Sequence, residues 1–458
     1  MSLKKNDKKT IRGWMMYDWA NSVYNLVISS AIFPIFYEGI TSSEKYSTTK
    51  IINGHEQVMI HAFGYEFINT SLITYIGALG FLIVAFISPI LSGVADYVGR
   101  KKIFMRIFVY IGSFSCMALY FFDIKYIEFS FLFYILALIG FWASLVFYNA
   151  YLPEIADKEQ HDKISAGGFS MGYLGGVSLL TICLILITFH DSFGFKDVIN
   201  NGEIIEYGKS NATRFAFLLT GVWWFGFSHI FFSRVQDSTE KYKVSTKMLG
   251  NGFRELRVVF KEFMGIETLK RFLPAFFMIS TGVQTVMVVA VYFAAKVIFT
   301  GEYEDQKSTG LILSILLIQL IAIPGAIGMA RVSRKIGNIT SLQIIIVAWI
   351  ITIIYTYFIQ TPNQFYVAAA MVGMVMGSVQ ALSRSTYSKF LPKTEDTAAY
   401  FSFYDVTEKL AIVLGMFLFG FLEQITGDMR NSILVIGLFF VLAFILLMFV
   451  PKDNKKKL

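Results

Sequence analysis

The stretch WMMYDWANSVYN, residues 14–25, opens the first long apolar segment of the chain, which continues to Ile40. At about 100° per residue its polar side chains share one helical stripe roughly 120° wide, made of Tyr17, Asp18, Asn21, Tyr24 and Asn25. Polar groups in hydrocarbon need partners or water, so a helix surrounded by lipid cannot keep such a stripe. The pattern predicts a membrane helix with one face against protein or a wet cavity. The alternative is a polar helix end at the membrane interface.

Apolar residues dominate the rest of the chain and arrive in long runs. They make up 55% of the 458 residues, and only 16% are charged, against about 25% in ordinary soluble domains. Runs of about 20 apolar residues separated by short charged stretches are typical of membrane-spanning helices. We therefore expect an all-α polytopic membrane protein with twelve spans, near residues 15–40, 71–95, 103–122, 127–151, 166–190, 213–235, 270–299, 308–330, 340–360, 364–390, 401–425 and 429–450.

The basic residues indicate the orientation of these spans. The N-terminal tail, alternate loops and the C-terminal tail hold most of the Lys and Arg. By the positive-inside rule, both termini are expected in the cytoplasm. We expect the membrane to be the inner membrane of a bacterium. This distribution accounts for the net charge of +8 without a nucleic-acid partner.

The longest basic interruption divides the chain into two sets of six spans. We expect a cytoplasmic tail, a six-helix bundle, a linker, a second bundle and a basic tail, at residues 1–13, 14–235, 236–269, 270–450 and 451–458. In the linker, apolar residues recur at helical spacing, at Phe253, Leu256, Val259, Phe260 and Phe263. They predict an amphipathic helix on the membrane surface, next to anionic headgroups.

The two halves also resemble each other in sequence. SPILSGVADYVGRKK (88–102) aligns with IPGAIGMARVSRKIG (323–337), and YNAYLPE (148–154) aligns with YSKFLPK (387–393) at nearly the same offset. A shared offset indicates duplicated halves, as in many secondary transporters.

Several charges lie one or two turns inside the expected spans, where they are costly unless paired or hydrated. They are Asp18, Arg384, Asp405, Glu408 and Lys409. Asp405 and Lys409 are spaced to pair within one helix, which leaves Glu408 as a partner for Arg384. These groups predict a substrate clamp, a proton-coupling site or a bridge that closes the cytoplasmic side. We assign Asp18 first to that gate.

Neutral polar residues near mid-membrane predict a cavity for a small zwitterion, with Arg384 facing a carboxylate and Asp18 or Glu408 facing an amine. The alternative is hydrogen bonding between helices. The candidate substrate contacts are Tyr17, Asn21, Tyr24, Asn25, Tyr148, Asn149, Gln284, Gln380, Arg384 and Tyr404, of which Tyr24 and Asn25 are the deepest in span one.

The loop GVADYVGRKK (93–102) joins spans two and three. It resembles the signature loop of the major facilitator superfamily, G-x-L-A-D-x-x-G-R-K, at Ala95, Asp96, Gly99, Arg100 and Lys101, with Val94 in place of Leu and with Gly93 one position after the first Gly of the pattern. The resemblance implies two rocking halves, a monomer, and a cytoplasmic latch formed by this loop. The alternative is a positive-inside loop with turn glycines.

Four further stretches resemble the vacuole-effluxer-like family, which contains fungal vacuolar amino-acid effluxers and bacterial relatives. They are YDWANSVY (17–24), FYNAYLPEIAD (147–157), GYLGG (172–176) and GSVQALSRS (377–385). The resemblance implies proton-linked or facilitated export or exchange of small solutes, with amino acids as the leading class. A carboxylate would carry the proton, and Asp18, Asp405 and Glu408 are the candidates.

Two other classes of function compete with transport. A membrane-embedded enzyme needs a convergent catalytic set, but GFSMG (168–172) lies in an apolar helix and HEQVMIH (55–61) lacks the spacing of a zinc helix. We therefore expect no enzymatic activity, cofactor or metal. A receptor or scaffold is suggested only by the basic linker.

Overall fold

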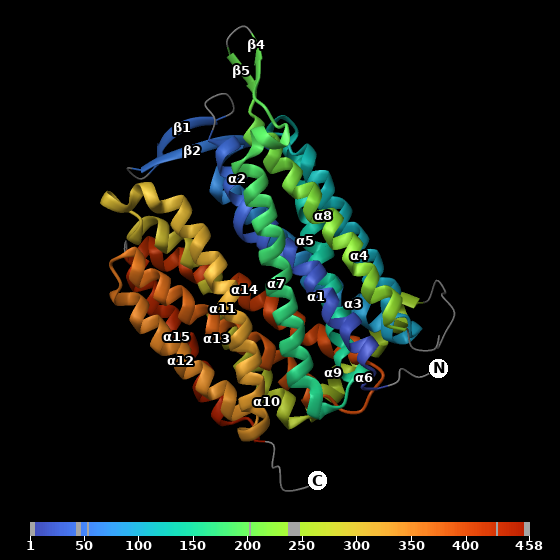
Figure 1. Cartoon of the computed structure of the whole chain (residues 1–458). Helices are drawn as coiled ribbons and strands as arrows, with labels where there is room; N and C mark the ends of the chain where they lie inside the picture. Colours follow the sequence, from blue (N-terminus) through green and yellow to red (C-terminus); the bar gives the residue numbers. More distant parts are fainter. Residues whose placement is uncertain are drawn as a thin grey trace.

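The computed structural model describes residues 5–42, 47–52, 55–200, 203–236, 248–426 and 429–452. Long helices run side by side through most of the molecule (Figure 1). The start of α1 and the end of α15 lie at one end of the bundle, which we call the terminal side, and two small β-sheets lie at the other, which we call the hairpin side (Figure 1).

The N-terminal half begins with one continuous helical span. It is α1 (Lys8–Val23), a π-helical stretch (Tyr24–Ala31) and α2 (Ile32–Thr41). The helices that follow are α3 (Asn69–Val98), α4 (Lys101–Ala118), α5 (Ile127–Ala150), the short α6 (Leu152–Ile155), α7 (His161–Thr188) and α8 (Gly208–Arg234).

The C-terminal half contains a second set of long helices. They are α10 (Glu267–Phe293), α11 (Lys307–Ile336), α12 (Asn338–Phe358), α13 (Pro362–Phe390), α14 (Thr397–Thr426) and α15 (Met429–Met448). In the described part of the chain, nine helical segments are long and apolar enough to cross a membrane. α10, α14 and α15 cover the three remaining predicted spans. The predicted all-helical polytopic fold is thereby confirmed.

Local sequence explains where several helices begin and end. Asp7 caps α1 by accepting a hydrogen bond from the backbone of Thr10. Thr361 and Gln364 form a capping box at the start of α13, with Pro362 in the first turn. Gly99 ends α3 in the left-handed region at φ 77°, which a residue with a Cβ adopts at a cost.

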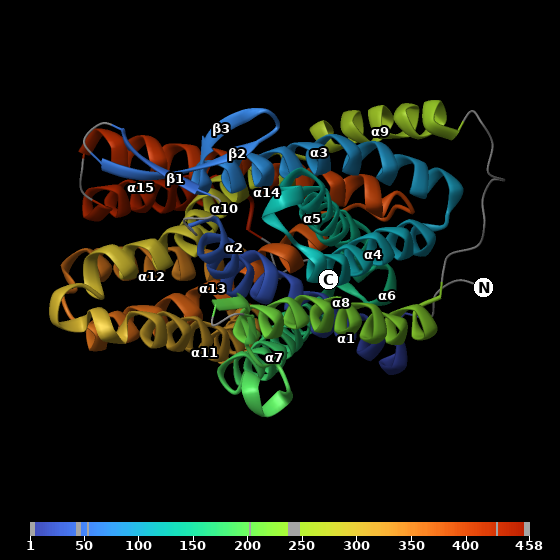
Figure 2. The same ribbon diagram turned by 90° about the horizontal axis from the view of Figure 1, so that it is seen from above.

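The two halves repeat the same packing. α1 packs on α7 as α10 packs on α14, and α4 packs on α8 as α12 packs on α15. Between the halves, α3 packs on α14 and α7 packs on α11. Figure 2, viewed from above, shows the two sets side by side.

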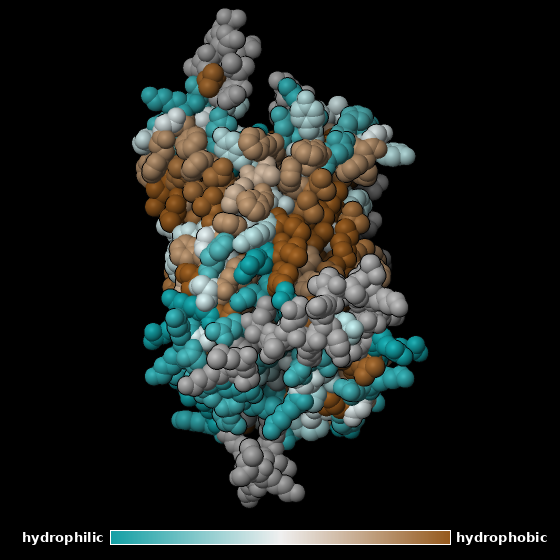
Figure 3. All heavy atoms as spheres, turned by 90° about the vertical axis from the view of Figure 1, so that its right-hand side faces the viewer, coloured by the Kyte–Doolittle hydropathy of each residue, from teal (hydrophilic) through white to brown (hydrophobic). Residues whose placement is uncertain are grey.

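The outer surface is apolar between polar ends. On the face in Figure 3, hydrophobic side chains gather between hydrophilic surfaces. Large exposed apolar side chains include Phe86, Phe114, Ile182 and Ile351. An exposed apolar surface of this kind suits contact with lipid tails.

Two antiparallel sheets on the hairpin side are an addition to the predicted all-α fold. One contains β1 (Ser47–Ile52), β2 (His55–Ala62) and β3 (Tyr65–Ile68), and the other contains β4 (Val198–Asn200) and β5 (Glu203–Glu206). β2 buries Met59, Ile60 and Ala62, so the first sheet is packed against the bundle. A hydrogen bond from Lys50 lowers the pKa of Glu66 on this sheet.

The linker between the halves contains α9 (Met248–Gly265), which packs on α3 and α14. Val259 and Phe263 are buried, and Phe260 is about half exposed at 48%. Residues 237–247 and the side chain of Phe253 lie outside the described residues. Contact of this segment with lipid headgroups stays a prediction.

Candidate functional site

A cavity of about 150 Å³ lies between the two halves of the bundle. Its walls come from α1 with the following π-helical stretch, α5 and α7 on one side, and from α10, α11, α13 and α14 on the other. The amide and hydroxyl side chains of its lining are those of Asn21, Ser22, Asn25, Asn149, Tyr173, Ser280, Gln284, Gln319, Gln380, Ser383 and Tyr404. About 10–15 Å³ of such volume is enough to hold one water molecule, so this space suits a small solute.

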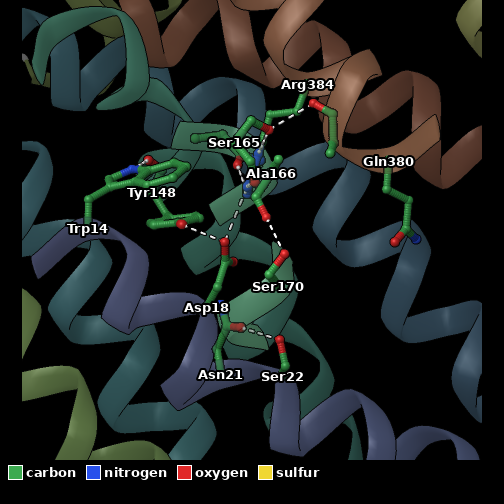
Figure 4. Close-up of polar contacts among 12 residues, drawn as sticks. Trp14, Asp18, Asn21, Ser22, Tyr148, Ser165, Ala166, Ser170, Gln380 and Arg384 are labelled. Carbon is green, nitrogen blue, oxygen red and sulfur yellow. Dashed lines mark hydrogen bonds and ion pairs between the residues drawn. The ribbon is translucent and has the colours of Figure 1, made fainter. Parts of the chain in front are cut away.

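Arg384 of α13 crosses the boundary between the halves and pairs with Asp18 of α1. Arg384 Nη2 lies 3.2 Å from Asp18 Oδ2, and the Tyr148 hydroxyl donates to the same oxygen over 2.7 Å. Arg384 Nε and Nη2 also donate to Ser165 Oγ and O, each over 2.9 Å. Figure 4 shows these side chains pointing toward one another. Both charged side chains are less than one-tenth exposed, so the pair is held away from water.

Aromatic rings enclose the Arg384 guanidinium. Its central carbon lies 4.0 Å from the centroid of the Phe169 ring and 4.8 Å from that of the Trp14 ring. Trp14 in turn stacks on Tyr148 at 4.4 Å and donates its indole N–H to the Tyr148 carbonyl over 2.9 Å. Such cation–π contacts stabilise a guanidinium removed from water.

Small residues on α7 make room for this pair. A Cβ at Gly168 would lie 2.4 Å from Asp18 Oδ2 and 3.0 Å from Arg384 Nη2. A Cβ at Gly172 would lie 2.4 Å from Ser22 Oγ. The close approach of α7 to α1 therefore depends on glycine at these positions, as in small-residue contacts between other membrane helices.

A second charged cluster lies on α14. Lys409 Nζ bonds Asp405 Oδ1, lies 3.4 Å from Glu408 Oε2 and lies 3.7 Å from the centroid of the Trp142 ring in the other half. Gln284 Nε2 donates to Glu408 Oε1 over 3.2 Å. The predicted Asp405–Lys409 pair is confirmed.

The predicted pairing of Glu408 with Arg384 is corrected by these contacts. Arg384 forms its ion pair with Asp18 of the other half, and Glu408 contacts Gln284 and Lys409 instead. Spacing along one helix could predict the pair within α14, but the partner of Arg384 depends on how the two halves meet.

The loop predicted as a latch touches the other half on the terminal side. Asp96 accepts a hydrogen bond from the backbone N–H of Ala399 over 2.7 Å, near the start of α14. Lys101 lies 3.0 Å from Asp96 and also bonds Glu154. It donates to Thr397 Oγ1 over 2.6 Å. Of the other predicted latch residues, Gly93 lies buried within α3, and Gly99 and Arg100 form the junction between α3 and α4.

Another polar cluster on the terminal side was not predicted from the sequence. Asp162 of α7 accepts hydrogen bonds from Lys389 Nζ over 2.6 Å, Asn338 Nδ2 over 2.8 Å and Ser333 Oγ over 2.9 Å. Its three partners come from three different helices of the C-terminal half. No local spacing could have indicated this cluster.

The predicted substrate contacts divide between the cavity and the interior of the N-terminal half. Tyr17 donates to Ser144 over 2.7 Å, and the Tyr24 ring stacks on Phe141 at 4.8 Å. These tyrosines form one edge of the polar stripe, which faces α5 and α8. Its other members line the cavity together with most of the remaining candidates, namely Asp18, Asn21, Asn25, Asn149, Gln284, Gln380, Arg384, Tyr404 and Glu408. Tyr148, Asp405 and Lys409 lie behind this lining.

Sequence reasoning missed several lining residues. Trp142, Phe169, Tyr173 and Gln319 line the cavity, and Tyr173 donates to Gln380 over 2.6 Å. Aromatic residues are common on lipid-facing surfaces, so residue type alone did not separate Trp142, Phe169 and Tyr173 from the other aromatic residues of the chain.

The sequence model of the family described as "Vacuole effluxer Atg22 like" matches residues 6–457. The chain belongs to this family. Its Atg22-like relatives include the "Uncharacterized MFS-type transporter YxiO" of Bacillus subtilis, which is 28% identical over 99% of this chain and 97% of that protein. "Autophagy-related protein 22-1" of Aspergillus terreus is 22% identical over 95% of this chain and 87% of that protein.

Solved structures identify the fold of this Atg22-like chain. The major facilitator superfamily transporter FucP, in an outward conformation, aligns with a TM-score of 0.71 at 11% identity, over 96% of this chain and 98% of FucP. The proton:xylose symporter XylE aligns with a TM-score of 0.66 at 12% identity, over 97% and 96%. The Atg22-like protein has the major facilitator fold. As a member of the effluxer family, it is a membrane transporter and not an enzyme.

Proposed function

We propose that this Atg22-like transporter moves a small polar solute by alternating access, through rocking of its two halves about the central cavity. The observation that carries the proposal is the position of the cavity, whose walls come from both halves. A solute held there would contact each half. Relative movement of the halves would then open the cavity first to one side and afterwards to the other.

Contacts between the halves indicate which side is closed. The Asp18–Arg384 pair, the Asp96 and Lys101 contacts and the Asp162 cluster all join the halves on the terminal side of the cavity. The distribution of Lys and Arg favours a cytoplasmic terminal side, and the Bacillus subtilis relative favours a bacterial inner membrane. We therefore infer an outward-facing state.

The favoured solute is an amino acid or a similar zwitterion, and the favoured direction is export. The effluxer family supports both preferences, and the amide and hydroxyl groups of the lining suit a polar solute. In the closed state Arg384 is occupied by Asp18, so its first role is to bridge the gate. The lipid contact of the linker and a monomeric state remain proposals.

A cross-link across the closed side tests alternating access. Glu154 and Thr397 lie on opposite halves, with Glu154 Oε1 and Thr397 Oγ1 2.6 Å apart. In a Glu154→Cys/Thr397→Cys variant, a short bifunctional methanethiosulfonate, which oxidises both thiols into one disulfide-linked bridge, should abolish solute flux in proteoliposomes, and a reductant should restore it. Each single-cysteine variant is the control. Undiminished flux through the oxidised double variant would rule out rocking at this interface.

Proton coupling is a separate proposal, and Asp18, Asp405 and Glu408 are its candidate carriers. Each lies in contact with a basic side chain, so uptake of a proton would weaken that ion pair. Asp18→Asn, Asp405→Asn and Glu408→Gln should be compared for flux driven by a pH gradient. At least one should lose coupling while keeping exchange. Full coupling in all three variants would refute a role for these carboxylates.

A further inference from the structure

Two of the charged side chains that line the cavity form an ion pair with each other, and a third, a carboxylate, faces the cavity. Among the described residues that line the cavity, Asp18, Arg384 and Glu408 carry charge. Asp18 and Arg384 neutralise each other at 3.2 Å. The chemistry that remains available to a solute therefore depends on Arg384 and Glu408.

Arg384 has little left to offer a solute carboxylate. Its N–H groups donate to Asp18, to two oxygens of Ser165 and, over 3.4 Å, to Asn149 Oδ1. Phe169 and Trp14 lie against the guanidinium, and its side chain is only 3% exposed. Recognition of a carboxylate by arginine uses two parallel N–H donors on one edge. No such edge of Arg384 is open in this state.

Glu408, unlike Arg384, is accessible from the cavity. Its side chain is 21% exposed, and it belongs to the cavity lining. Lys409, which approaches its Oε2, is buried and also bonds Asp405. When ionised, Asp405, Glu408 and Lys409 together carry one net negative charge. A buried net charge is unfavourable without a counter-charge, so this cluster favours a cation.

Aromatic side chains around Glu408 suit the same kind of ligand. Tyr404 lies one helical turn before Glu408 on α14, and its ring stacks on Phe276 of α10 at 4.0 Å. Both rings line the cavity. Trp142, on the opposite wall, already accepts an ammonium group, because Lys409 Nζ lies 3.7 Å from its centroid. Ring faces attract ammonium groups and offer nothing comparable to a carboxylate.

Given the transport function proposed above, we propose that Glu408 binds the ammonium group of the solute and that a solute carboxylate is dispensable. The substrate class is then small organic amines, and amino acids enter it through their amino group. A carboxylic acid without an amine is excluded, because it would add a second negative charge beside Glu408.

Valine and two compounds that each lack one of its charged groups test this assignment: 2-methylpropylamine lacks the carboxylate, and 3-methylbutanoate lacks the amine. Thermal unfolding of the purified full-length protein is followed as each is titrated. The amine and valine should raise Tm with similar concentration dependence, because both present an ammonium group, and the acid should leave Tm unchanged. Stabilisation by the acid, failure of the amine to stabilise, or tenfold weaker binding of the amine than of valine would overturn the proposal.

Two variants test whether Glu408 is the residue that binds the amine. Glu408→Gln should weaken binding of the amine at least tenfold. Glu38→Gln, the same change at an exposed carboxylate of α2, should leave it unchanged. Unaltered amine binding by Glu408→Gln would overturn the role of Glu408, and the three-probe comparison on the unmodified protein stands even if that variant does not fold.

Flux separates this inference from the transport function on which it rests. Amine binding that depends on Glu408, without flux in proteoliposomes, would refute transport and leave the recognition mode standing. Flux of valine that 3-methylbutanoate inhibits and 2-methylpropylamine does not would keep transport and refute the recognition mode.

Discussion

At the residue scale, the closed state depends on one buried ion pair and the space left for it. Asp18 and Arg384 are both buried, and the hydroxyl of Tyr148 and both oxygens of Ser165 satisfy their remaining hydrogen-bonding groups. Breaking a buried pair by removing one partner costs about 3–5 kcal/mol, because the other charge is left uncompensated. Removing one charge of the pair should therefore cost more stability than replacing both charged residues by uncharged ones.

A double-mutant cycle on this pair measures that coupling. Asp18→Asn should lower the free energy of unfolding by about 3–5 kcal/mol, since Arg384 then stays buried without a counter-charge. Arg384→Gln should have a similar effect, and the double variant should lose clearly less than the sum of the two. Denaturation of each variant in detergent gives the four values. Strict additivity would show that the two side chains do not act together.

Gly168 gives a second prediction at this scale. Gly168→Ala places a methyl group 2.4 Å from Asp18 Oδ2, and overpacking of this kind costs about 1–3 kcal/mol. At the neighbouring Gly167, the same change meets the sulfur of Met15, on a long unbranched side chain that can move. Thermal unfolding should therefore show a clear loss for Gly168→Ala and little for Gly167→Ala. Equal losses would mean that the pair tolerates the methyl group.

At the scale of elements, α9 joins the linker to the interface of the halves. It packs on α3 and α14, which come from opposite halves, and Phe263 is buried while Phe260 is about half exposed. The Phe263 ring lies 5.4 Å from that of Phe403 on α14. The position of α9 is therefore coupled to the contact between α3 and α14.

Truncation of α9 side chains tests this packing. Phe263→Ala should destabilise the protein by about 3–5 kcal/mol, as expected for a buried phenylalanine. Phe260→Ala, the same change on the more exposed face of α9, should cost distinctly less. Thermal unfolding in detergent compares the two. A larger loss for Phe260→Ala would show that this face of α9 is buried against protein rather than exposed.

At the scale of the whole molecule, opening of the terminal side requires the halves to release one another at several places. Asp96 of the N-terminal half accepts a hydrogen bond from the backbone N–H of Ala399 in the C-terminal half. This N–H lies near the positive end of the α14 dipole. A carboxylate at a helix N-terminus contributes about 0.3–2 kcal/mol. Asp96 also forms a buried ion pair with Lys101, but both residues belong to the N-terminal half, so that pair does not hold the halves together. The contact with Ala399 does, and it should tune the balance between states.

Asp96→Asn should shift that balance toward opening on the terminal side. The change keeps an oxygen acceptor and removes the charge, so about 0.3–2 kcal/mol of closed-state preference is lost. A cysteine at the cavity position Gln380 should then react faster with a polar thiol reagent applied from the terminal side, by roughly 2- to 30-fold. Gln380→Cys without the Asp96 change is the reference. A slower reaction would contradict a latch that favours closure.

The sequence predicted the helical fold and one ion pair within a helix, but not the contacts between the two halves. Apolar runs and the latch motif predicted the helical fold, and the i, i+4 spacing predicted the Asp405–Lys409 pair. Helical periodicity placed Tyr24 and Asp18 on one stripe, but it could not say which edge would face the cavity. The partners of Arg384 and Asp162 come from the opposite half. Such contacts depend on how the halves dock, which local spacing does not encode.

The polarity of the pairs between the halves has a further consequence. In both Asp18–Arg384 and Asp162–Lys389 the acid belongs to the N-terminal half and the base to the C-terminal half. Separation on the terminal side therefore leaves these two acids without their partners on one half and these two bases without theirs on the other. Dissolved ions screen exposed charges and hardly reach buried ones, with a Debye length of about 8 Å at physiological ionic strength. Ionic strength on the terminal side should thus favour the open state selectively, which makes the salt concentration in that compartment a control on the cycle.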